Sequence, residues 1–284
     1  MKIQDGCNYF CSYCIIPYLR GRVRSRKSAE VIKEVVTLEE KGYNEIVLSG
    51  INIGTYQDDK TDLTRLIEQL LINTTTVRFR LSSIEPNLIT DEMIKLVKNN
   101  DRLCNYFHIP LQHGAGPVLK RMNRKYNPAE FATVMKRIRA EVPDICIGAD
   151  AIVGFPGETD ADFEQMADFI CKMNFSYLHV FRYSKREGTK AATMKPQVPD
   201  IKKKERSAEL RKLGEQLKKE YIAKFLNRNL TVLFEQELKK DRWGGNSGNF
   251  IYVKVNYNKN LNNQLKKVKI TNVFNSHAEG EIIE

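Results

Sequence analysis

The sequence predicts an α/β chain in which a partial barrel of six parallel strands is followed by a small antiparallel β-barrel. Two observations lead to this expectation. Through the first two-thirds of the 284 residues, short strand-like runs alternate with amphipathic helix-like runs, which is typical of parallel strands joined by crossover helices. Near the carboxyl end, short alternating runs separated by Gly- and Asn-rich turns take over, which is typical of a small barrel. We expect domains at residues 1–222 and 223–284.

The six strands of the first domain are expected at residues 1–5, 45–48, 77–81, 103–109, 146–153 and 177–181. Six units are too few to close an eight-stranded barrel, so an open partial barrel or a doubly wound sheet remains. Ligands of both architectures bind at the carboxyl ends of the strands. The sequence segments that carry chemistry should therefore directly follow a strand.

Helices are expected between these strands, each opened by a residue suited to cap it. They cover residues 28–41, 61–71, 90–97, a run from Asn127, and 159–173, with caps at Ser28, Thr61, Thr90, Asn127 and Thr159. Residues 202–225 read as a charged helical connector. Beyond it, the small barrel should contain strands at 230–237, 250–255 and 268–273, with a turn at 244–248.

The charge of the chain indicates a polyanionic partner. The formal charge is +11, and residues 201–284 contain 18 Lys and Arg against 10 Asp and Glu. Nucleic acid is the first candidate partner, while a solvated surface that only maintains solubility is the alternative. The longest apolar runs are too short to span a bilayer, and no secretory signal is visible, so we expect a cytoplasmic protein without a membrane partner.

Three of the six cysteines crowd into one loop after the first strand, as Cys7-x3-Cys11-x2-Cys14. Thiolates are soft ligands that suit iron–sulfur clusters and zinc. Structural zinc sites usually close with a fourth Cys or His, but the next cysteine along the chain is Cys104. Three ligands predict a cluster with one open iron. A zinc site completed by a distant His, or three unligated thiols, are the alternatives.

This cysteine motif, with Tyr13 before the last cysteine, resembles the signature of the radical S-adenosylmethionine superfamily. Residues 2–26, which continue through Arg20-Gly21-Arg22 and Arg24-Ser25-Arg26, resemble its methylthiotransferase branch, and within it the enzymes that act on threonylcarbamoyladenosine beside the tRNA anticodon. The resemblance implies a 4Fe-4S cluster and S-adenosyl-L-methionine as cofactors. It also implies a 5′-deoxyadenosyl radical that abstracts hydrogen from C2 of the adenine, where a methylthio group is inserted.

Later segments resemble the same family: 49–52, 80–86, 108–114, 150–159 and 179–184. The resemblance implies that S-adenosylmethionine contacts come from these segments and from the cysteine loop. The cofactor-binding residues expected on this basis are Tyr13, Ser49, Gly50, Ser82, Ser83, Glu85, Gly154 and Phe181. Read singly, several of them could be ordinary loop residues, and Gly154 stands before a Pro-Gly turn.

The carboxy-terminal module resembles the TRAM domain, a small RNA-binding barrel. The implied partners are tRNA and an electron donor such as flavodoxin or ferredoxin. Tyr252 could stack on a base, whereas Phe250 is expected to fill the barrel core. The RNA-binding residues expected are Arg20, Arg22, Arg24 and Arg26 beside the cysteines, and Lys239, Lys240, Arg242, Lys254, Lys266, Lys267 and Lys269 on the barrel.

The family pattern includes an amino-terminal domain whose cysteines hold a second, sulfur-donating cluster, and the sequence contains no counterpart of it. Cys104, Cys146 and Cys171 lie far apart and read as core residues, so we expect a truncated form. Three alternatives stay open: the same chemistry on isopentenyladenosine of tRNA, the same chemistry on an aspartate of a ribosomal protein, and a non-catalytic RNA-binding protein that holds zinc.

Overall fold

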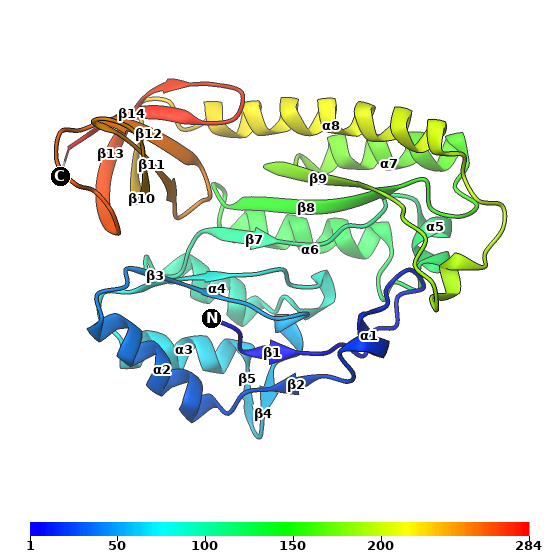
Figure 1. Cartoon of the computed structure of the whole chain (residues 1–284), viewed down its shortest axis with the longest axis horizontal. Helices are drawn as coiled ribbons and strands as arrows, with labels where there is room; N and C mark the ends of the chain where they lie inside the picture. Colours follow the sequence, from blue (N-terminus) through cyan, green and yellow to red (C-terminus); the bar gives the residue numbers. More distant parts are fainter. Residues whose placement is uncertain (284) are drawn as a thin grey trace.

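The computed structural model describes residues 1–283, and its first part is an open barrel of parallel strands (Figure 1). Ladders join β3 to β6 and β7 to β8 to β9, all parallel, and single bridges Lys2–Ser49 and Phe79–Leu103 connect the remaining neighbours. The order of the strands across the barrel therefore follows the sequence, which agrees with the partial barrel and not with the doubly wound sheet. The strands are β1 (Gln4–Asp5), β3 (Glu45–Leu48), β6 (Arg78–Leu81), β7 (Tyr106–His108), β8 (Cys146–Val153) and β9 (Tyr177–Arg182).

The barrel is open along one side. Short β2 (Arg24–Ser25) pairs antiparallel with β1, and β9 pairs with β8 alone among the described residues. A small hairpin of β4 (Gln57–Asp58) and β5 (Thr61–Asp62) lies beside β2. The seam between β9 and β2 leaves the inner face of the strands accessible from the side.

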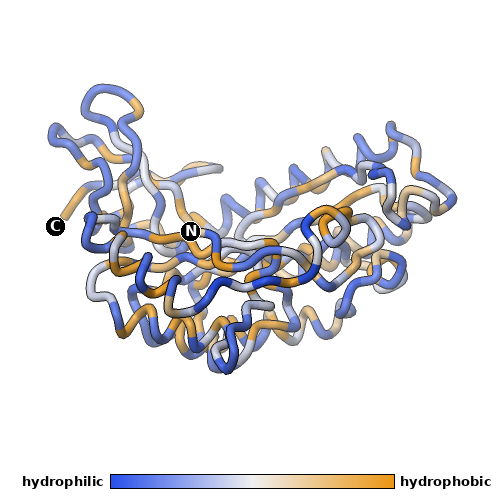
Figure 2. Tube along the Cα trace, turned by 60° about the horizontal axis from the view of Figure 1, so that its bottom comes forward, coloured by the Kyte–Doolittle hydropathy of each residue, from blue (hydrophilic) through white to orange (hydrophobic). Residues whose placement is uncertain are grey.

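Helices cover the outside of the strands, and the turned view in Figure 2 shows the trace curved like a trough. The crossover helices are α2 (Ser28–Glu40), α3 (Leu63–Asn73), α4 (Asp91–Asn99), α6 (Pro128–Glu141) and α7 (Asp160–Met173). Shorter helical elements are α1 (Ile16–Leu19), α5 (Gly116–Arg121), η1 (Ile53–Thr55), η2 (Pro86–Leu88) and η3 (Lys190–Ala192).

Three of the five predicted helix caps are confirmed. Thr90 accepts from the third amide of α4, and Asn127 and Thr159 form capping boxes with Glu130 and Asp162. The predictions for Ser28 and Thr61 are wrong, because side chains nearby take over their roles. The Asp58 carboxylate accepts from the Ser28 amide at 2.7 Å, and Asp62 caps α3 while Thr61 belongs to β5.

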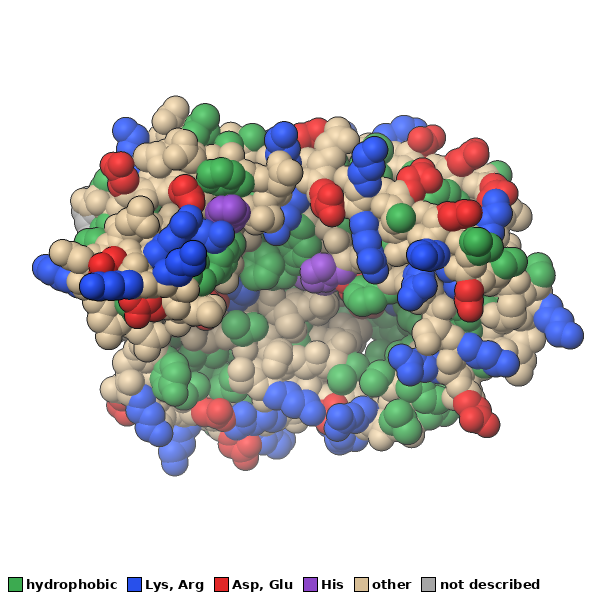
Figure 3. Space-filling view, turned by 45° about the horizontal axis from the view of Figure 1, so that its top comes forward, with side chains coloured by type: hydrophobic (Ala, Val, Ile, Leu, Met, Phe, Trp, Pro, Cys, Tyr) green, Lys and Arg blue, Asp and Glu red, His purple; other side chains and the backbone are tan. Residues whose placement is uncertain are grey.

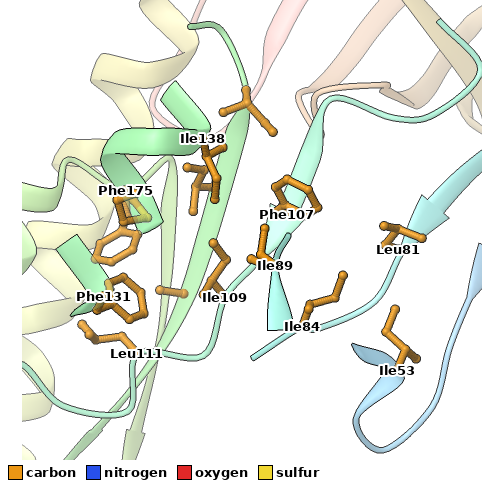
Figure 4. Packing of buried hydrophobic residues seen from close by; sticks show 14 of the residues in the cluster. Ile53, Leu81, Ile84, Ile89, Phe107, Ile109, Leu111, Phe131, Ile138 and Phe175 are labelled. Carbon is orange, nitrogen blue, oxygen red and sulfur yellow. The ribbon is translucent and has the colours of Figure 1, made fainter. Parts of the chain in front are cut away.

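The main core lies between the strands and the crossover helices. Figure 4 shows Phe107, Ile109 and Leu111, from β7 and the segment after it, packed against Phe131 and Ile138 of α6. All five side chains are fully buried. This core fixes the ends of the strands, from which the candidate site is built.

After η3, the long helix α8 (Asp200–Ala223) runs along β9 and leads to a closed five-stranded barrel. The strand order in this small barrel is β10-β11-β12-β14-β13. Strands β12 and β14 pair in parallel, so the prediction of a wholly antiparallel barrel is wrong for this pair. The predicted turn at 244–248 is mostly strand β11. The strands are β10 (Asn229–Lys239), β11 (Arg242–Ser247), β12 (Tyr252–Asn256), β13 (Gln264–Val273) and β14 (Ala278–Ile282).

The small barrel docks on the amino-terminal ends of the barrel strands through buried charges. Arg78 and Arg80 of β6 both pair with Glu45 of β3, and the three side chains are 6%, 6% and 12% exposed. The guanidinium of Arg78 donates to the backbone carbonyl of Asn246 at 2.8 Å, and that of Arg80 donates to Ser247 at 2.9 Å. No helix of the described chain is long and apolar enough to cross a membrane.

Candidate functional site

The three clustered cysteines lie on the loop between β1 and α1, at the carboxyl ends of the barrel strands. All three are half-buried. Backbone bonds shape the loop: the Cys14 amide donates to the Cys11 carbonyl at 3.0 Å, and the Tyr9 amide donates to Cys7 Sγ at 3.4 Å. Gly6 opens the loop with φ +72°, and a Cβ there would lie 2.0 Å from the Arg22 carbonyl oxygen. Only glycine permits this approach.

A buried cation that the sequence analysis missed stands beside the cysteines. Arg124 Nη1 lies 3.2 Å from Cys11 Sγ and 3.4 Å from the Tyr13 hydroxyl, and its other amine pairs with Glu85. The Arg124 side chain is 2% exposed. Burial raises the pKa of the Cys7 thiol above its usual range, whereas the positive charge of Arg124 acts to lower it. Arg124 therefore favours the thiolate form that metals require. The sequence offered no signal, because Arg124 is one of several basic residues in its segment.

The three sulfur atoms are not gathered as closely as the ligands of one zinc ion. Around a single tetrahedral zinc, thiolate sulfurs lie about 3.8 Å apart, given Zn–S bonds of about 2.3 Å. Among the described residues, one group of three His, Cys, Asp or Glu ligand atoms lies within 4.8 Å of one another, and it is His108, Asp150 and His179. The cysteine sulfurs are therefore spread more widely than a single ion requires.

Unpaired polar atoms lie on the segments that follow β3 and β6. The side-chain amide of Asn52 and the hydroxyl of Ser82 are buried and have no hydrogen-bond partner among the described residues. Such orphaned groups are costly unless a ligand or water completes them. Gly50 stands at a close contact, since a Cβ would lie 2.8 Å from the Gln4 carbonyl oxygen. These positions fit a polar ligand beside the cysteines, and Asn52 adds to the residues expected from the sequence.

The other expected cofactor residues are more dispersed. Ser49 bonds to the backbone of Met1 and so helps to join β1 and β3, while Ser83 is half-buried after β6. Glu85 is engaged by Arg124. At Gly154, φ is +72° and the place of a Cβ is filled by the Lys203 stem, 2.2 Å away. Tyr13 meets Phe155 edge-on.

A second polar group lies deeper in the barrel, on the inner face of β7, β8 and β9. His108 Nε2 is 3.0 Å from one Asp150 oxygen, and His179 Nδ1 is 3.4 Å from the other. Behind them, the Tyr177 hydroxyl contacts His108 Nδ1 at 2.8 Å and the Tyr106 hydroxyl at 2.7 Å. Burial acts to raise the pKa of Asp150, but the hydrogen bonds from the two histidines hold it at about 2.

This polar group adjoins a cavity of about 670 Å³ between β9, α8 and the small barrel. Phe181, which is 52% exposed, lines it together with His179. Figure 3 shows the corresponding hollow, with hydrophobic side chains on its floor and a histidine at its edge. The prediction that Phe250 fills the small-barrel core is wrong, as its ring is 38% exposed and lies 4.8 Å from that of Tyr106 at the junction of the two barrels.

The four arginines near the cysteine loop are spread along its exposed side. Arg24 pairs with Asp5 at 3.3 Å, and Arg26 pairs with Glu34 at 2.6 Å. The Arg22 guanidinium lies over the ring of Phe10 at 4.4 Å. Arg20 and Arg22 are thus left with the more available charges.

The basic residues of the small barrel fall into two groups. Lys239, Lys240, Arg242 and Lys254 surround the β10–β11 turn and β12, while Lys266, Lys267 and Lys269 lie along β13. Arg242 pairs with Glu279, which reduces its free charge. Figure 3 shows Lys and Arg side chains gathered over the small barrel and around the hollow.

Comparisons with known proteins agree with this geometry. Residues 1–170 match the family model described as the Radical SAM superfamily. The chain is 41% identical, over its whole length, to the Bacillus subtilis protein named threonylcarbamoyladenosine tRNA methylthiotransferase MtaB, of which it covers 64%. It is 38% identical to the Thermoanaerobacter pseudethanolicus protein named tRNA-2-methylthio-N(6)-dimethylallyladenosine synthase, of which it covers 61%. The chain thus spans less than two-thirds of either relative.

Solved structures share the fold at low sequence identity. Coproporphyrinogen III oxidase HemN from Escherichia coli matches 87% of this chain, and 65% of its own, with a TM-score of 0.57 and 13% identity. The methyltransferase TsrM from Kitasatospora setae matches 68% of this chain, and 38% of its own, with a TM-score of 0.56 and 16% identity. These similarities bear on the fold alone.

Proposed function

Because the chain belongs to the radical SAM superfamily, we propose that it is the catalytic and RNA-binding part of a tRNA methylthiotransferase. The observation that carries the proposal is the cysteine loop: three half-buried thiols at the carboxyl ends of the strands, spaced too widely for one ion and backed by a buried arginine. Whole-chain similarity to two tRNA methylthiotransferases, at 41% and 38% identity, directs the proposal within the superfamily.

Cys7, Cys11 and Cys14 would ligate a 4Fe-4S cluster and leave its fourth iron to S-adenosylmethionine. When bound, the cluster would supply the electron that cleaves the sulfonium and generates the 5′-deoxyadenosyl radical. The side chains of the protein would hold these groups in place. Arg124 would offset negative charge at Cys11, and Asn52 and Ser82 would donate or accept hydrogen bonds with S-adenosylmethionine through their unpaired groups. Loop closure by Gly6 keeps the three thiols together. A flavodoxin- or ferredoxin-type protein would deliver the electron.

The small barrel would bind the anticodon arm through phosphate contacts. Lys239, Lys240 and Lys254 make no ion pair within the described chain, so their charges are available to RNA. Each phosphate contact adds about 0.7–0.9 to the slope of log affinity against log salt concentration. Replacement of these three lysines by glutamine should therefore flatten the salt dependence of tRNA binding by about 2, measured by filter binding between 50 and 300 mM KCl.

Two modified adenosines compete as the target within tRNA. We favour threonylcarbamoyladenosine, since the chain is 41% identical to the relative named for it and 38% identical to the relative named for dimethylallyladenosine. That difference is small, and the polar group of His108, Asp150 and His179 on the inner face of the barrel is a stronger reason, because it offers contacts to a hydrogen-bonding substituent that a hydrocarbon one cannot use. Isopentenyladenosine is the second candidate.

Anaerobic reconstitution tests the proposal directly. The chain should bind about four irons, become brown, and form 5′-deoxyadenosine from S-adenosylmethionine under dithionite. A colourless protein with one zinc per chain and no 5′-deoxyadenosine would refute the enzyme and favour a zinc-containing RNA-binding protein.

A further inference from the structure

We propose that the cavity between β9, α8 and the small barrel is a binding site for an anionic, hydrogen-bonding substituent on the target base, with His179 as its contact residue. The inference rests on the proposed function, since it names the part of the same enzyme that receives the N6 group. A threonine joined through a carbamoyl group carries a carboxylate, a hydroxyl and a urea, all of which need partners when buried.

The hydrogen-bond chain fixes which atom of His179 faces the cavity. The Asp150 carboxylate accepts from both imidazoles, so Nδ1 of His179 carries the proton that it donates to Asp150. Nε2 of His179 then has no hydrogen-bond partner among the described residues, and the side chain is 55% exposed. In that tautomer Nε2 is an acceptor, so this oriented and unpartnered imidazole at the edge of the cavity is suited to a hydroxyl or a urea N–H of the ligand.

The rest of the polar group has a supporting role. Tyr177 bonds to His108 and Tyr106, and its ring occupies the space above Gly148, where a Cβ would lie 2.0 Å from the tyrosine Cζ. These buried side chains therefore hold Asp150 from behind. Tyr177 also lines the cavity but is buried, whereas His179 is 55% exposed and is therefore the member of the group most accessible to a ligand.

The walls of the cavity supply the complementary charge. Arg211 and Lys218 of α8 line it and make no ion pair with any described residue, while Glu215 is the single acid among the cavity-lining residues. Two cations against one acid favour an anionic group over a hydrocarbon one. Phe181 and Tyr252 offer apolar surface for the flat part of a ligand.

The position in the barrel fits a base whose reacting atom is near the cysteines. His179 lies three residues before the end of β9, about 10 Å at 3.3 Å per residue. A purine held at the carboxyl ends of the strands could place a substituent of amino-acid size at that depth. The open seam beside β9 provides the entry.

Binding measurements on the cluster-loaded 284-residue chain test the site without turnover. The probes are three fluorescent anticodon stem-loops with threonylcarbamoyladenosine, dimethylallyladenosine or adenosine at the target position. The wild type should bind the first about tenfold more tightly than the third, the effect of one hydrogen bond to a charged group. His179→Ala and Arg211→Ala should each remove most of that ratio, which is taken for each variant between its own affinities for the two stem-loops.

Lys212→Ala is the matched control, because Lys212 is an exposed neighbour on α8 outside the cavity lining and should keep the full ratio. Melting curves and cluster absorbance show that each variant is folded and loaded. Equal affinity for all three stem-loops, or a preference for the dimethylallyl one, would overturn the site while the proposed function stands. Binding of none of them would overturn both. Uptake of one zinc ion that Asp150→Asn abolishes would also overturn the site, by showing that the polar group holds metal.

Discussion

Replacement of Glu45 by glutamine should loosen the attachment of the small barrel. The carboxylate of Glu45 lies between Arg78 and Arg80, and its distance to Arg80 Nε is 3.0 Å. The three side chains are at most 12% exposed, so Glu45→Gln leaves two buried guanidiniums without their counterion. Loss of one partner of a buried ion pair costs about 3–5 kcal/mol.

That cost corresponds to a melting temperature lower by about 6–20 °C, at about 2–4 °C per kcal/mol for a chain of this size. Circular dichroism measures the whole molecule, and the fluorescence of Trp243, the single tryptophan, follows the small barrel. Glu68→Gln makes the same chemical change at an exposed position of α3 and should stay within about 0.5 kcal/mol of the wild type. If the free energy of unfolding of Glu45→Gln is within 1 kcal/mol of the wild-type value, these charges do not hold the small barrel to the larger one.

The pH dependence has a definite sign. Burial acts to raise the pKa of Glu45, but hydrogen bonds and charge from Arg80 and Arg78 outweigh it and lower the pKa. A carboxyl group with a lowered folded-state pKa stabilises fully above its unfolded pKa of about 4.3, and this stability is lost as the pH falls through the folded value. The difference in stability between wild type and Glu45→Gln should therefore narrow below about pH 4.

Three further outcomes are expected. Cys11→Ala should lose the cluster and the formation of 5′-deoxyadenosine, while Cys146→Ala, at a buried position in β8, should keep both as judged by iron content and absorbance. Gly154→Ala should destabilise the fold by about 1–3 kcal/mol in urea titration, because φ is positive and the Lys203 stem fills the Cβ position. These 284 residues provide cysteine ligands for one cluster, so they should form 5′-deoxyadenosine but no methylthiolated nucleoside, and mass spectrometry of digested tRNA that detects the product would contradict this.

The alternation of strands and helices was predictable because it depends on local apolar periodicity. Strand β8 was placed at its observed bounds, and the helices that open at Thr90, Asn127 and Thr159 begin where the side chains predicted. The errors concern contacts between distant segments. Asp58, thirty residues downstream of Ser28, supplies the bond at the start of α2, and no local pattern indicates it.

The candidate site divides in the same way. The cysteines were evident because three ligands share one short loop, whereas Arg124 reaches them from another part of the chain. The series of hydrogen-bonded side chains from Tyr106 to His179 also joins residues of three separate strands. The segments 108–114, 150–159 and 179–184 singled out in the sequence include all three residues, but only the fold places Asp150 between His108 and His179.

The way in which the small barrel is attached affects how the two parts can diverge in evolution. Arg78 and Arg80 hold the barrel through backbone carbonyls of Asn246, Ser247 and Gly248, and every amino acid provides a backbone carbonyl. These polar contacts therefore depend on the backbone path of residues 246–248 and not on their side chains. Mutations can change the exposed surface of the small barrel while these contacts to the larger barrel are kept, which under the proposed function would let one scaffold acquire new RNA targets without rebuilding the joint.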